Sequence, residues 1–105
     1  MIDLTGKKAL ITGGSRGIGR ATAILFAKAG ADAAITYQRQ EKAAAEFKAG
    51  VEALGRSCLA LRAEISSEAE VRQAVEEIVS AWGRIDFLVN SAGIWTYLDV
   101  GSGDT

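Results

Sequence analysis

Apolar and polar positions divide the chain into short apolar runs that alternate with longer segments of helical periodicity. The short runs are bounded by glycine or polar residues, which is typical of buried strands. The longer segments repeat apolar side chains at three- and four-residue steps, which indicates amphipathic helices. The pattern predicts strands at 9–11, 31–36, 58–65 and 85–90, and helices at 18–29, 40–54 and, after a cap at Ser67, to about Trp82.

The predicted helices carry end signals and candidate core faces. Gly30, Gly55 and Gly83 follow them, and glycine is common just past a helix C-terminus. Ser67 followed by Glu70 is a capping-box pattern. The expected core positions are Ile18, Ala21, Leu25 and Ala29 in the first helix, Phe47, Val51 and Leu54 in the second, and Val71, Val75, Ile78 and Val79 in the third.

The alternation of strand and helix predicts a parallel sheet, because parallel neighbours are joined by crossover connections of this length. Right-handed crossovers put the first two helices on one face of the sheet, and a return of the chain beside the first strand puts the third helix on the other. The predicted fold class is therefore α/β, a three-layer Rossmann-type parallel sheet of strand order 3-2-1-4. A ligand is expected at the carboxyl ends of the first and fourth strands, where the strand order reverses.

Composition excludes several classes of function. The 105 residues suit one domain, and a formal net charge of −1 offers no basic excess for nucleic acid or anionic lipid. No apolar run approaches the roughly 20 residues of a membrane span. The N-terminus has an acid, Asp3, where a signal peptide has basic residues, so we expect a cytoplasmic location.

Histidine is absent and Cys58 is the only cysteine. A disulfide framework, a Cys/His zinc site and a histidine-based triad all fail on this residue count. Cys58 falls in a predicted buried strand without a basic neighbour, so we expect an inert packing thiol. No metal ligand is assigned.

A glycine-rich segment, T-G-G-S-R-G-I-G at 12–19, joins the first strand to the first helix. Its glycines allow positive φ and a close approach of the backbone to a pyrophosphate. The free N–H groups and the positive dipole end of the helix would stabilise the phosphate charge. The alternative is a turn whose glycines only tighten strand–helix packing.

The spacing T-G-x-x-x-G-x-G resembles that of the short-chain dehydrogenase/reductase family. Downstream, G-R-I-D-F-L-V at 83–89 and N-S-A-G at 90–93 are similar to further family motifs, with Ser91 in place of a second Asn. The resemblance covers essentially all of the chain, as the N-terminal coenzyme-binding part of proteins of about 250 residues. We therefore expect one NAD(P)-binding unit over 1–105, truncated after the fourth strand.

The resemblance also implies positions for the coenzyme. Residues of the glycine-rich segment would hold the pyrophosphate and adenosine ribose: Gly13, Ser15, Arg16, Gly17, Ile18 and Gly19. Asn90, Ala92 and Gly93 would line the path to the nicotinamide ribose, although Asn90 has an alternative role in bracing two strands. Glu64 stands where the family usually has an Asp at the adenine edge, and Ile65 would contribute a backbone contact.

The residues after the second strand bear on the choice of coenzyme. An acid there would bind the ribose 2′-hydroxyl of NAD, whereas an arginine accommodates the 2′-phosphate of NADP. The sequence reads Thr36-Tyr37-Gln38-Arg39, without an acid, and Arg16 lies in the glycine-rich segment. We therefore predict NADP (NADPH) over NAD, with Tyr37 and Arg39 among the contacts. The alternative is that both arginines are solvated surface residues.

By resemblance, the chemistry is hydride transfer between the nicotinamide and a carbonyl or alcohol carbon, assisted by a Ser, a Tyr and a Lys. The expected Y-x-x-x-K does not occur, because Tyr37 is followed by Glu41, Tyr97 by Gly101, and no Lys follows Lys48. No catalytic residue is assigned. The favoured hypothesis is the coenzyme-binding part of an NADP-dependent carbonyl reductase or alcohol dehydrogenase, a homo-oligomer in its full-length form. The alternatives are a non-catalytic nucleotide-binding module, or a fragment that completes its core with a partner, and an assembly piece that binds no nucleotide.

Overall fold

The computed structural model describes residues 2–13, 17–64 and 66–90 of the chain. Within them the predicted order of strands and helices is confirmed. The elements are β1 (Lys8–Thr12), α1 (Gly17–Lys28), β2 (Asp32–Tyr37), α2 (Glu41–Ala53), β3 (Cys58–Arg62), α3 (Glu68–Trp82) and β4 (Phe87–Asn90). The strands β3 and β4 are shorter than predicted, because β3 pairs with β2 only as far as Arg62 and β4 pairs with β1 only from Phe87.

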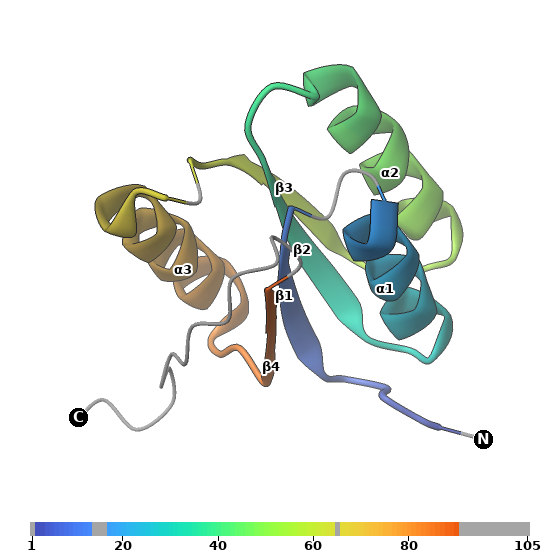
Figure 1. Cartoon of the computed structure of the whole chain (residues 1–105). Coiled ribbons are helices and arrows are strands. Elements are labelled where there is room, and N and C mark those ends of the chain that lie inside the picture. Colours follow the sequence, from blue (N-terminus) through green and yellow to red (C-terminus); the bar gives the residue numbers. More distant parts are fainter. Residues whose placement is uncertain (1, 14–16, 65, 91–105) are drawn as a thin grey trace.

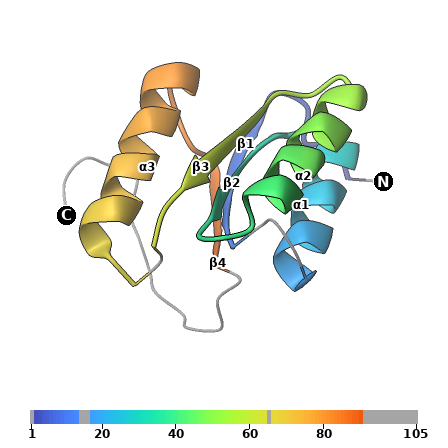
Figure 2. The same ribbon diagram turned by 90° about the horizontal axis from the view of Figure 1, so that it is seen from above.

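The sheet is parallel with the order β3-β2-β1-β4, as predicted. In the central strand, Leu10 is in register with Ala34 of β2 and Leu88 of β4. Helices α1 and α2 cover one face and α3 covers the other, so the molecule has three layers (Figures 1 and 2). This arrangement brings the carboxyl ends of β1 and β4 together at the point where the strand order reverses.

Alternate residues of the central strands point to opposite faces and form two cores. Ile11 and Ile35 are fully buried beneath α1 and α2, whereas Leu10 is fully buried on the side of α3. The helices contribute the buried side chains of Phe47 on the first face and Ile78 on the second, both at predicted positions. Near-complete burial of these aliphatic and aromatic side chains contributes about 1.5–3 kcal/mol each to stability.

The predicted core face of α1 is wrong. The helix buries Gly19, Ala23 and Ala27, while Ile18 is 81% exposed and Leu25 is 66% exposed. Ala21 is also exposed and Ala29 is half-buried. The small residues face the sheet because they let the helix backbone lie close to it, and this contact outweighs burial of the larger side chains.

Two helix-end positions of the predicted cores are also largely exposed, Leu54 at 46% and Val79 at 40%. The burial expected of Cys58 is confirmed: the residue is 3% exposed, and burial raises the pKa of its thiol to about 12. The expected absence of a basic neighbour is wrong, because Lys48 acts on this pKa in the opposite direction. No helix in the described ranges is long and apolar enough to cross a membrane.

Candidate functional site

Two threonines anchor the start of the glycine-rich segment at the carboxyl edge of the sheet. Thr12 and Thr36, which are 4% and 2% exposed, are the buried polar side chains of the described residues. The backbone N–H of Gly13 donates to Oγ1 of Thr36 at 3.0 Å. A buried amide without a partner costs about 1–3 kcal/mol, so this contact ties the segment to β2. Thr36 is not among the site residues predicted from the sequence. The signal that could have found it is a hydroxyl side chain directly after a fully apolar run.

Thr12 ties the same segment to β4. Its hydroxyl lies 3.3 Å from the carbonyl oxygen of Val89 and 3.2 Å from Oδ1 of Asn90, with which Thr12 is in register. The contact supports the bracing role that was the alternative for Asn90. A direct contact of Asn90 with a coenzyme stays a prediction.

Two glycines of the glycine-rich segment have a backbone conformation that favours glycine. Gly13 and Gly17 have φ of +70° and +65°, in the left-handed region that side chains other than glycine rarely adopt. A Cβ on Gly17 would have no atom within 4 Å, so it would project into open space at the beginning of α1.

The first turn of α1 also differs from those of its neighbours. It holds no acidic residue, whereas α2 begins with Glu41 and α3 has Glu68 and Glu70 in its first turn. Acidic side chains neutralise the positive end of the helix dipole. The N-terminus of α1 therefore retains its capacity to bind an anion, and Ile18 beside it is exposed. Gly19 is instead buried against the sheet.

Several predicted contacts lie outside the described residues: Ser15, Arg16, Ile65, Ala92 and Gly93. The assignments of these residues stay predictions.

As expected, no acidic residue stands directly at the end of β2. Tyr37 is half-buried and packs against the core under α1 and α2, while Arg39 is exposed. Arg39 makes no hydrogen bond or ion pair with any described residue. Asp32, the acid of this strand, lies at its opposite end. Arg62, which sequence reasoning overlooked, is exposed at the end of β3 and in register with Tyr37.

Glu64, just after β3, uses its carboxylate within the protein. It accepts hydrogen bonds from Nε2 of Gln38 and from the hydroxyl of Ser66, the latter at 3.1 Å. The expected capping contact at the start of α3 is confirmed, since Oγ of Ser67 accepts from the backbone N–H of Glu70 at 3.3 Å. The carboxylate of Glu70 departs from the capping-box pattern, because it accepts from the backbone N–H of Glu64 at 2.8 Å.

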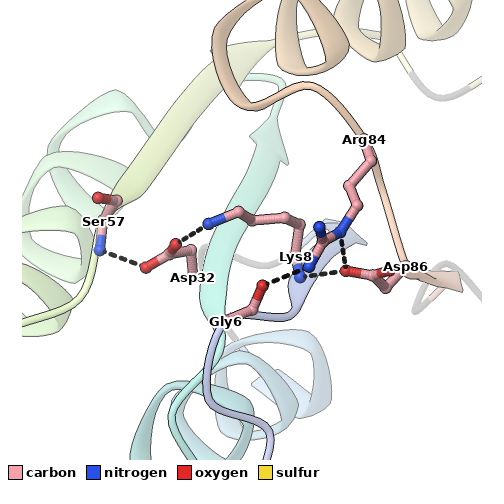
Figure 3. A network of polar contacts seen from close by, with 6 residues as sticks. All are labelled: Gly6, Lys8, Asp32, Ser57, Arg84 and Asp86. Atoms are coloured by element: carbon pink, nitrogen blue, oxygen red, sulfur yellow. Dashed lines mark hydrogen bonds and ion pairs between the residues drawn. The ribbon is translucent and has the colours of Figure 1, made fainter.

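The opposite, amino edge of the sheet holds a network of charged side chains (Figure 3). Lys8 forms an ion pair with Asp32, whose other oxygen accepts from the backbone N–H of Ser57 at 2.9 Å. Asp86 accepts from the backbone N–H of Lys8 at 2.8 Å and from Nε of Arg84 at 3.0 Å. These contacts link the starts of β1, β2, β3 and β4.

The network lowers the pKa of both carboxyl groups. Partial burial raises the pKa of Asp32, but hydrogen bonds from Lys8 and Ser57 more than offset this and leave the pKa below its ordinary value. At Asp86, burial likewise raises the pKa, and the backbone N–H of Lys8 together with Arg84 reverses the effect. Both groups are therefore ionised at neutral pH and act as structural acceptors.

Comparison with known proteins agrees with this geometry. The family model for short chain dehydrogenases matches residues 7–103. The chain belongs to the short-chain dehydrogenase family. Its solved relatives share its α/β fold with the strand order 3-2-1-4. The alternation of strands and helices in the sequence predicts the same fold.

Individual relatives differ in how much of them the chain covers. It is 47% identical to general stress protein 39 of Bacillus subtilis (strain 168) over 90 residues, 86% of this chain and 32% of the relative. It is 34% identical to the short-chain dehydrogenase/reductase homolog YusS of the same organism over 97 residues, 92% of this chain and 89% of the relative. The chain spans about a third of the length of the first curated relatives it matches.

A solved structure is similarly close. The short chain dehydrogenase from Burkholderia cenocepacia J2315, in complex with NADP, is 48% identical, with a TM-score of 0.83 over 91% of this chain and 39% of that one.

Proposed function

We propose that the chain is the coenzyme-binding part of an NADP-dependent oxidoreductase of the carbonyl reductase or alcohol dehydrogenase type. The observation that carries the proposal is the start of α1, where Gly17 has a positive φ, faces open space, and begins a first turn without an acid. These features fit a pyrophosphate, because the first N–H groups of a helix have no intrahelical partner and no acidic side chain of this turn neutralises their charge.

When bound, the coenzyme would supply or accept a hydride. The residues of this chain would bind and orient it. Gly13 and Gly17 would allow the close approach at the pyrophosphate, and Gly19 would let α1 pack closely against the sheet. The hydrogen bonds of Thr12 and Thr36 would hold the segment in place. Ser15, Arg16 and Ile18 would complete this half, while Asn90, Ala92 and Gly93 would lead toward the nicotinamide ribose.

The preference for NADP rests on Arg39. This arginine is exposed at the end of β2 and has no partner among the described residues. Positions 37–40 hold no acid to accept a ribose 2′-hydroxyl, and the next acid, Glu41, belongs to α2. A planar guanidinium binds a phosphate through two parallel hydrogen bonds. The NADP held by the Burkholderia relative is consistent with this choice.

Calorimetric titration of the chain with NADPH and NADH tests the proposal. We expect NADPH to bind, and Arg39→Ala to weaken NADPH by about tenfold or more while changing NADH by less than about twofold. Lys42→Ala is the matched control, because Lys42 is an exposed cation at the start of α2. Equal losses for both coenzymes in Arg39→Ala would remove it as the 2′-phosphate contact, and absence of binding of either coenzyme would overturn the assignment.

A second candidate is a nucleotide-binding module that performs no catalysis or completes its core with a partner. The observation that favours it is the match to YusS, of which this chain covers 89%. Coenzyme binding without oxidation of NADPH in the presence of a panel of ketones and aldehydes would favour the module. Turnover of a small carbonyl or alcohol by a longer polypeptide that contains these residues would favour the reductase.

A further inference from the structure

Glu64 lies where three segments of the chain meet at the carboxyl edge of the sheet. Its backbone N–H donates to the carboxylate of Glu70, and its carbonyl oxygen accepts from the backbone N–H of Ser67 at 2.9 Å. Both partners belong to the beginning of α3. The carboxylate of Glu64 accepts from the hydroxyl of Ser66 and from Gln38, which follows β2. Glu64 is thus fixed by α3 and reaches across to β2.

The segment 38–40, which carries Arg39, has few other restraints. At the N-cap of α2, Gln40 makes no side-chain capping hydrogen bond, in contrast to Ser67 at the N-cap of α3. Tyr37, directly before the segment, is held by the backbone N–H of Ala63, which donates to its carbonyl oxygen at 2.9 Å. In the described part of the chain, the side chains of segment 38–40 contact the residues after β3 through the hydrogen bond from Gln38 to Glu64.

We propose that Glu64 is a positioning residue for coenzyme preference. By accepting from Gln38, it holds the segment after β2 so that Arg39 stays at the edge where a ribose 2′-phosphate is expected. In this role, the carboxylate of Glu64 binds Gln38 and does not contact the adenine edge of the coenzyme. The inference rests on the proposed function, in which Arg39 binds that phosphate.

The negative charge of Glu64 and its hydrogen bond from Gln38 are expected to change NADPH affinity in opposite directions. A carboxylate near a phosphate disfavours binding by repulsion, whereas an ordered Arg39 favours it because less side-chain and backbone freedom is lost when the ligand binds. Glu64→Gln separates the two effects, since its amide oxygen still accepts from Gln38 but carries no charge. Glu64→Ala removes both.

The experiment compares dissociation constants of NADPH and NADH, measured by calorimetry on the 105-residue chain. We expect Glu64→Ala and Gln38→Ala each to weaken NADPH by about tenfold and NADH by less than about twofold, the size of one lost hydrogen bond to a charged group. The double variant should lose no more than either single variant, because both remove the same contact. Glu64→Gln should retain the NADPH preference, and Glu76→Ala, which removes an exposed carboxylate from α3, should match the wild type.

Specific results would overturn the inference. An equal loss for both coenzymes in Glu64→Ala would indicate an adenine contact or a general structural role. Additive losses in the double variant, or a loss in Glu64→Gln as large as in Glu64→Ala, would also contradict positioning through Gln38. If far-UV circular dichroism shows that Glu64→Ala does not fold, Gln38→Ala carries the test, because Gln38 is exposed and its removal leaves Glu64 intact.

The same titrations distinguish this inference from the proposed function. If the folded wild-type chain binds neither coenzyme, the proposed function fails and the role of Glu64 fails with it. If the wild type prefers NADPH and Arg39→Ala abolishes that preference, but Glu64→Ala and Gln38→Ala keep it, the proposed function stands and the positioning role of Glu64 is wrong.

Discussion

The two edges of the sheet are built from different chemistry. At the amino edge, Lys8, Arg84 and the carboxylates of Asp32 and Asp86 are paired with one another and with backbone groups (Figure 3). At the carboxyl edge, a Cβ on Gly17 would meet no atom within 4 Å, and Arg39 has no partner among the described residues. Charges at the amino edge therefore stabilise the fold, whereas the charge of Arg39 at the carboxyl edge is not used by a described residue.

The direction of the helices accounts for the difference. In a parallel sheet with crossover helices, each helix begins near the carboxyl edge and ends near the amino edge. The positive ends of the helix dipoles thus gather where the strands end. The helices α2 and α3 offset this with acidic residues in their first turns, and α1 does not. The comparison predicts that variants at one edge change ligand affinity and that variants at the other change stability.

The largest expected effect is at Gly17. Gly17→Val places a side chain at a positive φ and in the space expected for the pyrophosphate, so NADPH affinity should fall by at least about a hundredfold, or about 2.7 kcal/mol. Calorimetric titration measures the loss.

The matched control for this change is Gly50→Val. A Cβ on Gly50 also meets no atom within 4 Å, but its φ is not positive and it lies within α2. The NADPH affinity and the stability of the Gly50→Val variant should stay near those of the wild type, because Gly and Val are both moderately unfavourable in a helix. Unchanged NADPH affinity in Gly17→Val would remove the carboxyl edge as the phosphate site.

Next in size is a stability effect at the amino edge. Asp32→Ala removes the acceptor of Lys8 and of the Ser57 backbone N–H, and should lower the free energy of unfolding by about 2 kcal/mol in urea titrations. NADPH affinity should change by less than about twofold. Glu52→Ala breaks an exposed ion pair with Lys48 and should cost less than about 0.5 kcal/mol. A large loss of NADPH affinity in folded Asp32→Ala would contradict the separation of the two edges.

A smaller effect is expected at Thr36, which connects the core to the carboxyl edge. Thr36→Val removes the acceptor of the Gly13 N–H and should lower the unfolding free energy by about 1 kcal/mol and weaken NADPH a few-fold. Thr36→Ser keeps the hydroxyl and should bind NADPH as the wild type does. If Thr36→Val loses stability but keeps full affinity, the hydroxyl holds the sheet and not the glycine-rich segment.

The smallest expected effect is a change in how stability depends on pH. The folded-state pKa of Asp32 is lowered, so this group contributes stability above the unfolded pKa of about 3.9, and the contribution is lost as pH falls through the folded-state value. Unfolding free energies measured from pH 6 down to about pH 3 should therefore decline less steeply in Asp32→Asn than in the wild type. Identical slopes would show that the ion pair with Lys8 does not stabilise the fold.

The sequence alone determined the order of the elements, the parallel sheet and the place of the glycine-rich segment, because hydrophobic periodicity and glycine positions are local properties of the chain. Only the tertiary structure decided which side of α1 is buried. Ile18 and Leu25 formed as regular a stripe as Gly19, Ala23 and Ala27, and close packing against the sheet selected the smaller residues.

The contacts that organise the candidate site were likewise decided by the tertiary structure. Gly13 and Thr36 are 23 residues apart, and Gln38 and Glu64 are 26 apart. They meet because the register of parallel strands aligns the ends of β1, β2 and β3, and no local pattern specifies which side chains face each other across those ends. The sequence predicted a binding site at the carboxyl edge, and the strand register determined which side chains meet there.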